Sequence, residues 1–148
     1  MHAMPWEFLD DGVTSDVTFR ATGPDLDALF TAAAEATTTA MIEEAATTVR
    51  PTIEVPVAVT APALDLLLMR FLDELLFYKD ARGLVLRAES VAVRGDDAAG
   101  WTAHATLRGE PIDPARHALA ADVKAVTLYG LRVAPAATGW QAEVTLDV

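Results

Sequence analysis

Apolar and polar residues alternate in several stretches of the chain, and this period of two predicts half-buried β-strands. The clearest stretches are residues 17–22, 52–59, 101–107 and 140–148. Another strand is expected from Leu84, but its apolar positions change parity between Ala88 and Ser90, which indicates a β-bulge. Pro56 interrupts the second stretch. Because proline cannot donate a hydrogen bond to a neighbouring strand, that strand is expected at a sheet edge or a bulge.

Two further stretches repeat their apolar residues every three to four positions, which is typical of the buried face of a helix. The first is expected to begin at Pro24, a residue suited to the first turn, and to end near Thr47. The second is expected to run from Pro62 to Tyr78 or Lys79. Its apolar face is the wider of the two, so it is expected to be the most buried helix. A run of threonines lowers the helix propensity of the first helix, so packing must hold that part.

The order of these elements is strands, helix, strand, helix, strands. It predicts an α+β fold in which two helices pack on one face of a mixed, largely antiparallel sheet. The chain has 148 residues and just over half of them are apolar, which is enough for one core. We therefore expect residues 1–148 to form a single domain.

The last two strands are expected to form a hairpin around a loop at residues 134–139, with Val133 opposite Trp140. Lys124 then lies diagonal to Asp147, within reach of a lysine side chain. We expect the two residues to belong to one constellation on the side or end of the sheet away from the helices. The spacing alone is equally that of an ordinary cross-strand ion pair on a solvated surface.

Charge and composition restrict the classes of partner. The net charge is −11, from 22 acidic against 11 basic residues, so direct binding of RNA or DNA is not expected. Cysteine is absent, which excludes disulfides, zinc–thiolate sites and a cysteine nucleophile. The sequence has no signal-peptide pattern, and charges interrupt the apolar run at residues 64–76, so no membrane span is expected. A cytoplasmic location is the expectation.

A short turn-rich loop contains Asp10, Asp11 and Asp16. Carboxylates in a turn can converge on a hard cation such as Ca²⁺ or Mg²⁺, although aspartate is also common in turns for backbone reasons. The spacing of His104 and His117 is not that of a zinc site, and both are expected at the surface. The sequence contains no glycine-rich phosphate loop and no nucleophile motif.

The most distinctive stretch is a loop punctuated by prolines that turns into an apolar strand, residues 109–131, reading GEPIDPARH and then ALAADVKAVTLYGL. It resembles the archease family, and the resemblance extends over nearly the whole chain. The opening Trp6–Asp10, the segment Thr14–Val17 and the ending Leu146-Asp147-Val148 match that family as well. The first loop is longer by two residues and lacks the histidine that the family has after its first aspartate.

The resemblance implies a protein that activates an RtcB-type RNA ligase in tRNA splicing and RNA repair. That ligase uses GTP and manganese, and the activator promotes its guanylylation and multiple turnover without being an enzyme itself. The implied metal-binding acids are Asp10, Asp16 and Asp147, and the implied cation is divalent, Ca²⁺ first, with Mg²⁺ or Mn²⁺ as alternatives. The implied partner-activating residues are Lys124 and Asp122, the latter in place of the family's usual glutamate.

Two other functions remain open on the residues alone. One is a general chaperone or protein-binding module, which would act on unrelated clients. The other is a small metal-dependent phosphoester hydrolase, for which the sequence offers no distinct nucleophile or base.

Overall fold

The computed structural model describes residues 5–9 and 16–148 of the chain. Its elements, in chain order, are β1 (Trp6–Leu9), β2 (Asp16–Gly23), α1 (Leu26–Met41), α2 (Ala45–Thr48), β3 (Ile53–Ala61), α3 (Leu64–Arg82), β4 (Leu84–Asp96), β5 (Gly100–Pro111), β6 (Ala125–Ala136) and β7 (Gly139–Asp147). No helix among them combines the length and apolar character needed to cross a membrane.

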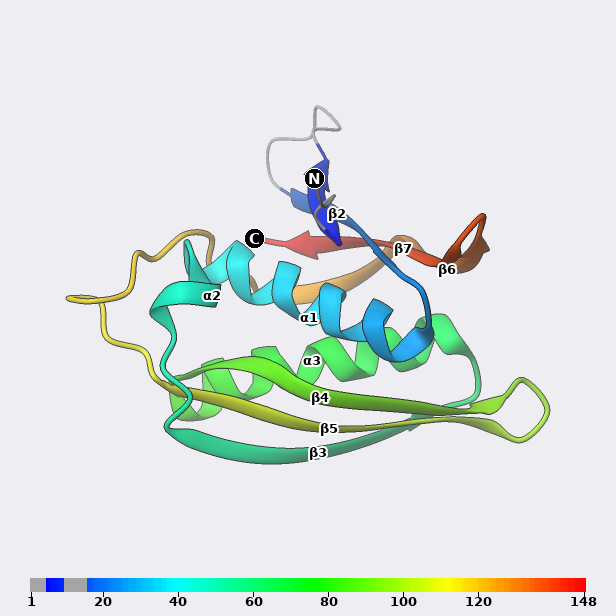
Figure 1. Ribbon diagram of the computed structural model, residues 1–148. Coiled ribbons are helices and arrows are strands. Elements are labelled where there is room, and N and C mark those ends of the chain that lie inside the picture. The colour runs from blue at the N-terminus through cyan, green and yellow to red at the C-terminus, as the bar shows by residue number, and fades with distance from the viewer. Residues whose placement is uncertain (1–4, 10–15) are drawn as a thin grey trace.

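The two long helices, α1 and α3, lie between two sheets (Figure 1). One sheet has the strand order β1-β2-β7-β6 and the other the order β3-β5-β4. The α+β class is confirmed. The structure differs from the expectation in having two sheets rather than one, and every pairing between the described strands is antiparallel. Each helix therefore packs against apolar residues on two sides.

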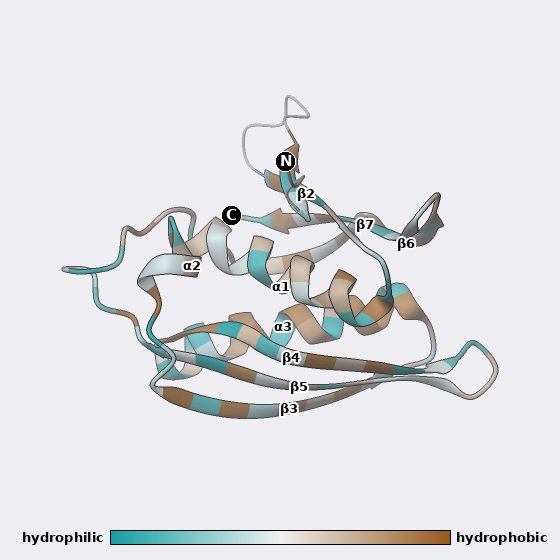
Figure 2. Ribbon diagram, in the orientation of Figure 1, coloured by the Kyte–Doolittle hydropathy of each residue, from teal (hydrophilic) through white to brown (hydrophobic). Residues whose placement is uncertain are grey.

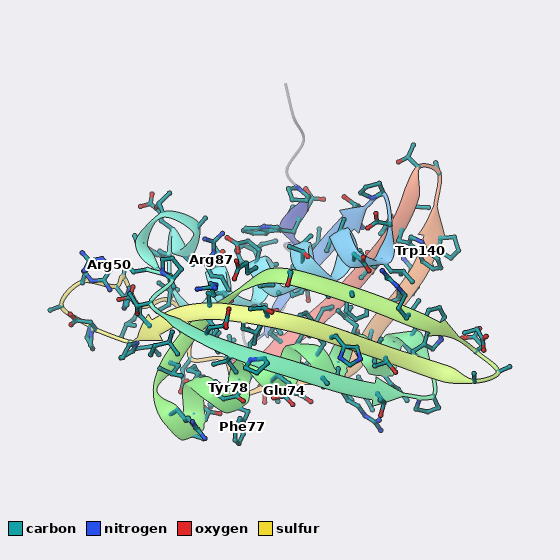
Figure 3. All side chains as sticks on the ribbon, turned by 60° about the horizontal axis from the view of Figure 1, so that its bottom comes forward. Arg50, Glu74, Phe77, Tyr78, Arg87 and Trp140 are labelled. Atoms are coloured by element: carbon teal, nitrogen blue, oxygen red, sulfur yellow. The ribbon has the colours of Figure 1, made fainter. Side chains whose placement is uncertain are left out.

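The first long helix, α1, is the more buried one, so the expectation that favoured the second helix is wrong. Ten of its 16 residues are buried, against six of 19 in α3. The reason is position: α1 packs against strands of both sheets and against α3, whereas α3 keeps an outward side on which Figure 3 shows Glu74, Phe77 and Tyr78. The threonine run of α1 is held by packing, as expected: Thr37 and Thr38 are fully buried, and the Thr38 hydroxyl donates to the Leu86 carbonyl at 2.8 Å.

The ends of both helices differ from the sequence prediction. The first helix stops at Met41 instead of near Thr47, because Ile42 is extended and forms a bridge with Leu119. A separate short helix, α2, follows Glu44, which has a left-handed backbone with φ 53°. The second long helix begins at Leu64 and continues to Arg82.

The irregular features expected for the smaller sheet are confirmed. Its register shifts between Ala88 and Ser90, where the sequence changes parity. Pro56 lies in β3, an edge strand that pairs only with β5 among the described strands. Figure 2 shows the alternation of hydropathy along β3, whose apolar residues face the helices and whose polar residues face outwards.

Candidate metal and partner site

Two carboxylates lie opposite each other at one end of the larger sheet. The antiparallel register of β2 and β7 places Asp16 directly across from Asp147. Residues directly opposite in such a pair lie on the same face, with Cβ atoms about 4.5–5.5 Å apart. Neither carboxylate has a hydrogen bond or ion pair within the described part of the chain. Like charges in this position repel each other, so the pair is suited to a bound cation.

Lys124 lies beside this pair, immediately before β6. Its backbone N–H donates to the Asp147 carbonyl at 2.8 Å, and the next residue, Ala125, is the register partner of Asp147. Lys124 is exposed, and its ammonium has no partner in the described residues. Asp16, Lys124 and Asp147, here called the sheet-end site, thus come from three neighbouring strands or strand ends.

The expected hairpin register is wrong: Ala125 rather than Val126 lies opposite Asp147, so Lys124 adjoins Asp147 through a backbone hydrogen bond and is not its diagonal neighbour as expected. The turn is shorter than expected, so Pro135 rather than Val133 lies opposite Trp140. The register then shifts between Thr127 and Arg132. This irregularity includes Gly130, whose φ of 65° suits glycine. The alternation of the sequence alone could not reveal the shift, because apolar residues occur on both parities of this strand.

The sheet-end site contains the donor type that a hard divalent cation prefers. Both ligands would be carboxylate oxygens, which suit Ca²⁺, Mg²⁺ or Mn²⁺ better than a soft metal. Mg²⁺ is commonly held by only one or two carboxylates together with waters, so two acids are chemically sufficient. The described residues contain no group of three or more acidic or histidine side chains close enough to share an ion. The third expected ligand, Asp10, lies outside the described residues.

Asp122 is paired with a lysine other than Lys124. Lys79 of α3 approaches the Asp122 carboxylate at 3.2 Å and donates to the Val123 carbonyl at 2.6 Å. The side chain of Lys79 is only 12% exposed, so these contacts are partly shielded from solvent. Lys79 therefore attaches the segment that precedes Lys124 to the second long helix. A role for Asp122 toward a partner stays a prediction.

A hollow of about 630 Å³ adjoins the sheet-end site at the C-terminal end of α1. Its lining includes Phe8, Leu9, Asp16, Glu43, Glu44 and Ala121. Glu43 and Glu44 are exposed and have no ion-pair partner in the described residues. No sequence pattern predicted that these two acids would lie near the site, because only the early end of α1 brings them into the same hollow as Asp16.

Two polar side chains of the 109–131 stretch, Glu110 and His117, are buried rather than free. Glu110 is 7% exposed and accepts from the Arg50 backbone N–H at 2.6 Å and from the Arg116 guanidinium. His117 is 2% exposed, so the expectation of a surface histidine is wrong. Its Nδ1 accepts from the Asp113 N–H at 2.9 Å, which leaves the proton on Nε2 to be donated to Glu110 at 3.1 Å. These residues are called the Glu110 cluster.

The electrostatics of the Glu110 cluster favour a charged carboxylate. Burial by itself raises the pKa of Glu110, but the bonds from Arg116, Arg50 and His117 outweigh it and lower the pKa to about 2. Arg116 also donates to the Thr48 carbonyl at 2.8 Å, which attaches the loop to α2. The preceding Gly109 is a packing requirement, because a Cβ there would lie 1.8 Å from the Val85 carbonyl oxygen. The cluster fixes the loop that leads to Lys124.

Comparison with known proteins agrees with this architecture. Residues 6–148 match the model of the Archease protein family. Proteins named "Protein archease" from Methanopyrus kandleri and Pyrococcus abyssi are 31% and 30% identical to the chain. The alignments cover 98% and 97% of it, and 100% and 98% of those relatives. The solution structure of Methanobacterium thermoautotrophicum protein 1598 superposes with a TM-score of 0.82 at 31% identity, covering 99% of this chain and 100% of that one.

Proposed function

The chain belongs to the archease family, and from this premise we propose that it is a protein cofactor of an RtcB-type RNA ligase. It would promote guanylylation of the ligase by GTP and allow repeated turnover in tRNA splicing and RNA repair. The observation that carries the proposal is the sheet-end site, in which two carboxylates with no hydrogen-bond or ion-pair partner among the described residues lie opposite each other, with an exposed lysine beside them.

Each residue of the sheet-end site has a distinct part in this proposal. Asp16 and Asp147 would hold a divalent cation, Ca²⁺ by the family resemblance, with Mg²⁺ and Mn²⁺ as alternatives. When bound, such an ion supplies positive charge to a phosphate oxygen. Lys124, whose backbone is hydrogen bonded to Asp147, would offer its exposed side chain to a phosphate of GTP or of the guanylylated ligase. Lys79 and the Glu110 cluster orient the segment that carries Lys124.

The proposed chemistry belongs to the ligase, and the protein contributes binding and positioning. Its charge of −11 is consistent with docking on a basic, phosphate-handling surface rather than with direct RNA binding. This acidic surface also increases the rate of encounter with a basic partner.

The test is a ligation assay at limiting enzyme, with and without the protein, in which guanylylation and product per ligase molecule are measured. The wild type is expected to raise both quantities. Lys124→Ala and Asp147→Asn are expected to lose most of the effect. Asp73→Asn, an exposed acid on α3, is the matched control and is expected to behave as wild type. Equal turnover with and without the wild-type protein would refute the proposal.

A further inference from the structure

A groove of about 740 Å³ runs along the outward face of α1. Its floor is formed by Ala28, Thr31, Ala32, Glu35 and Thr39, whose spacing places them on one side of the helix. Trp6 of β1 forms one wall, and Arg87 of β4 with the short helix α2 forms the other. In Figure 1, α1 lies between β1 and β4. The small floor residues leave room for larger side chains of another molecule.

Two charged residues along the groove, Glu35 and Arg87, neutralise each other. Arg87 binds the Glu35 carboxylate through two nitrogens, at 3.0 and 3.1 Å, and donates to the Ala46 carbonyl at 3.1 Å. Figure 3 shows Arg87 on β4 beside the α2 segment. Because this pair is satisfied within the fold, the groove offers a mainly apolar surface along its length. Such a surface is suited to apolar side chains of a partner.

The charges at one end of the groove are not neutralised. There the groove shares Thr39 and Glu44 with the hollow that adjoins the sheet-end site. Glu43 and Glu44 have no ion pair in the described part of the chain, and no lysine or arginine lines that hollow. The apolar groove therefore ends beside two carboxylates, those of Glu43 and Glu44. An apolar segment that carries a lysine or arginine at the matching end would satisfy both parts.

The backbone holds Glu44 at the junction of the two spaces. Its carbonyl accepts hydrogen bonds from the N–H and the hydroxyl groups of Thr47 and Thr48, at 3.0–3.1 Å. Its φ of 53° is the only positive value at a non-glycine residue in the described chain. A glycine would fit this backbone with less strain. The Glu44 carboxylate makes no hydrogen bond or ion pair with the described residues, so this residue can be substituted without loss of such a bond.

We propose that the α1 groove binds an apolar, lysine- or arginine-bearing segment of the partner ligase, and that Glu43 and Glu44 receive its positive charge. The identity of the partner rests on the proposed function, whereas the chemistry of the segment rests on the groove itself. The acidic end selects a basic segment and rejects an acidic one. It also brings that segment next to Lys124 and Asp147, where the ligase active site is proposed to dock.

The first experiment measures the dissociation constant of the intact ligase for variants of the full chain. Ala28→Trp fills the floor, and Glu43→Lys combined with Glu44→Lys reverses the charge at the acidic end. Each is expected to weaken binding about tenfold or more, the size of effect seen at central interface residues. Ala81→Trp, an exposed alanine near the end of α3, is the matched control and is expected to bind as wild type. The charge-reversed variant changes only exposed side chains, so its affinity for the ligase tests the proposal even if Ala28→Trp does not fold.

The second experiment identifies the segment. The chain has no cysteine, so Thr31→Cys creates a single thiol in the groove for a photo-activated cross-linker. Mass spectrometry of the cross-linked ligase is expected to find an apolar peptide containing lysine or arginine, and Ala81→Cys is expected not to yield that peptide. An acidic peptide, or the same peptide from both positions, would overturn the proposal.

The two proposals fail in different ways. If the wild-type protein neither binds nor stimulates the ligase, the proposed function fails, and the ligase is then not the partner of the groove either. If the wild type stimulates the ligase and the groove variants bind it equally well, only the groove proposal fails.

Discussion

The Glu110 cluster and the sheet-end site are both built from charged residues, but these charges are paired in the cluster and have no side-chain partner among the described residues in the sheet-end site. In the Glu110 cluster the carboxylate is buried, and three donors surround it. In the sheet-end site, two carboxylates lie opposite each other, and neither they nor Lys124 have a side-chain partner in the described residues. The first arrangement contributes to folding, because removing one partner leaves a buried charge. The second is open to a ligand.

One segment of the chain, residues 110–124, connects the two regions. The loop held by Glu110 and Arg116 leads through Asp122 and Val123, which Lys79 binds, to Lys124. The paired charges of the Glu110 cluster and of Lys79 thus position Lys124, whose own charge has no partner in the described residues. A substitution in the cluster is therefore expected to change stability first, and a substitution in the sheet-end site to change binding without a large change in stability.

The largest effect is expected for Glu110→Gln. It removes a buried carboxylate from the partly buried Arg116, so the free energy of unfolding is expected to fall by about 3 kcal/mol. Urea denaturation followed by circular dichroism measures this change. Glu54→Gln, which removes an exposed partner of Arg108, is the control and is expected to cost less than about 1 kcal/mol. An equal loss of unfolding free energy in the two variants would show that the Glu110 cluster does not stabilise the fold more than an exposed ion pair does.

The same cluster predicts a pH dependence. The pKa of Glu110 is lowered from 4.5 to about 2 in the folded protein, so its contribution to stability is fully present above pH 4.5. That contribution is lost as the pH falls from about 4.5 towards 2. The difference in unfolding free energy between wild type and Glu110→Gln is expected to shrink over this window. A constant difference between pH 5 and pH 2 would contradict the assignment.

A smaller effect is expected for the two opposed acids. Without a divalent cation, Asp147→Asn removes a repulsion across the strands and is expected to leave stability unchanged or raise it by roughly 0.2–1 kcal/mol. With Ca²⁺, the melting temperature of the wild type is expected to rise and that of Asp16→Asn or Asp147→Asn to stay the same. Asp73→Asn serves as the control and is expected to keep the shift. If EDTA and Ca²⁺ give the wild type the same melting temperature, Asp16 and Asp147 do not hold that ion.

The smallest effect on stability is expected for Lys124→Ala. The side chain of Lys124 is exposed and makes no hydrogen bond or ion pair with the described residues, so the unfolding free energy is expected to change by less than about 0.5 kcal/mol. The comparison that sharpens this result is Lys79→Ala, which removes the contacts to Asp122 and Val123 and is expected to destabilise the protein more. A large loss of stability for Lys124→Ala would mean that Lys124 supports the fold.

The sequence alone determined the class of fold and most of its elements. Alternation located the strands, and the bulge at Ala88–Ser90 and the edge position of Pro56 followed from parity and from proline chemistry. These features are local, because side-chain periodicity and backbone hydrogen bonding act over a few residues. The likeness to the archease family also directed attention to Asp16, Lys124 and Asp147.

Only the tertiary structure decided how these local pieces combine. It divided the sheet in two and placed the helices between the halves, which made the alanine-rich α1 more buried than the leucine-rich α3. It buried His117 beside Glu110 and ended α1 early enough to bring Glu44 near Asp16. It also set Asp16 opposite Asp147 across 131 positions of sequence. Such contacts depend on which surfaces meet when the whole chain packs, and residues that are distant in sequence leave no local periodicity from which that meeting can be predicted.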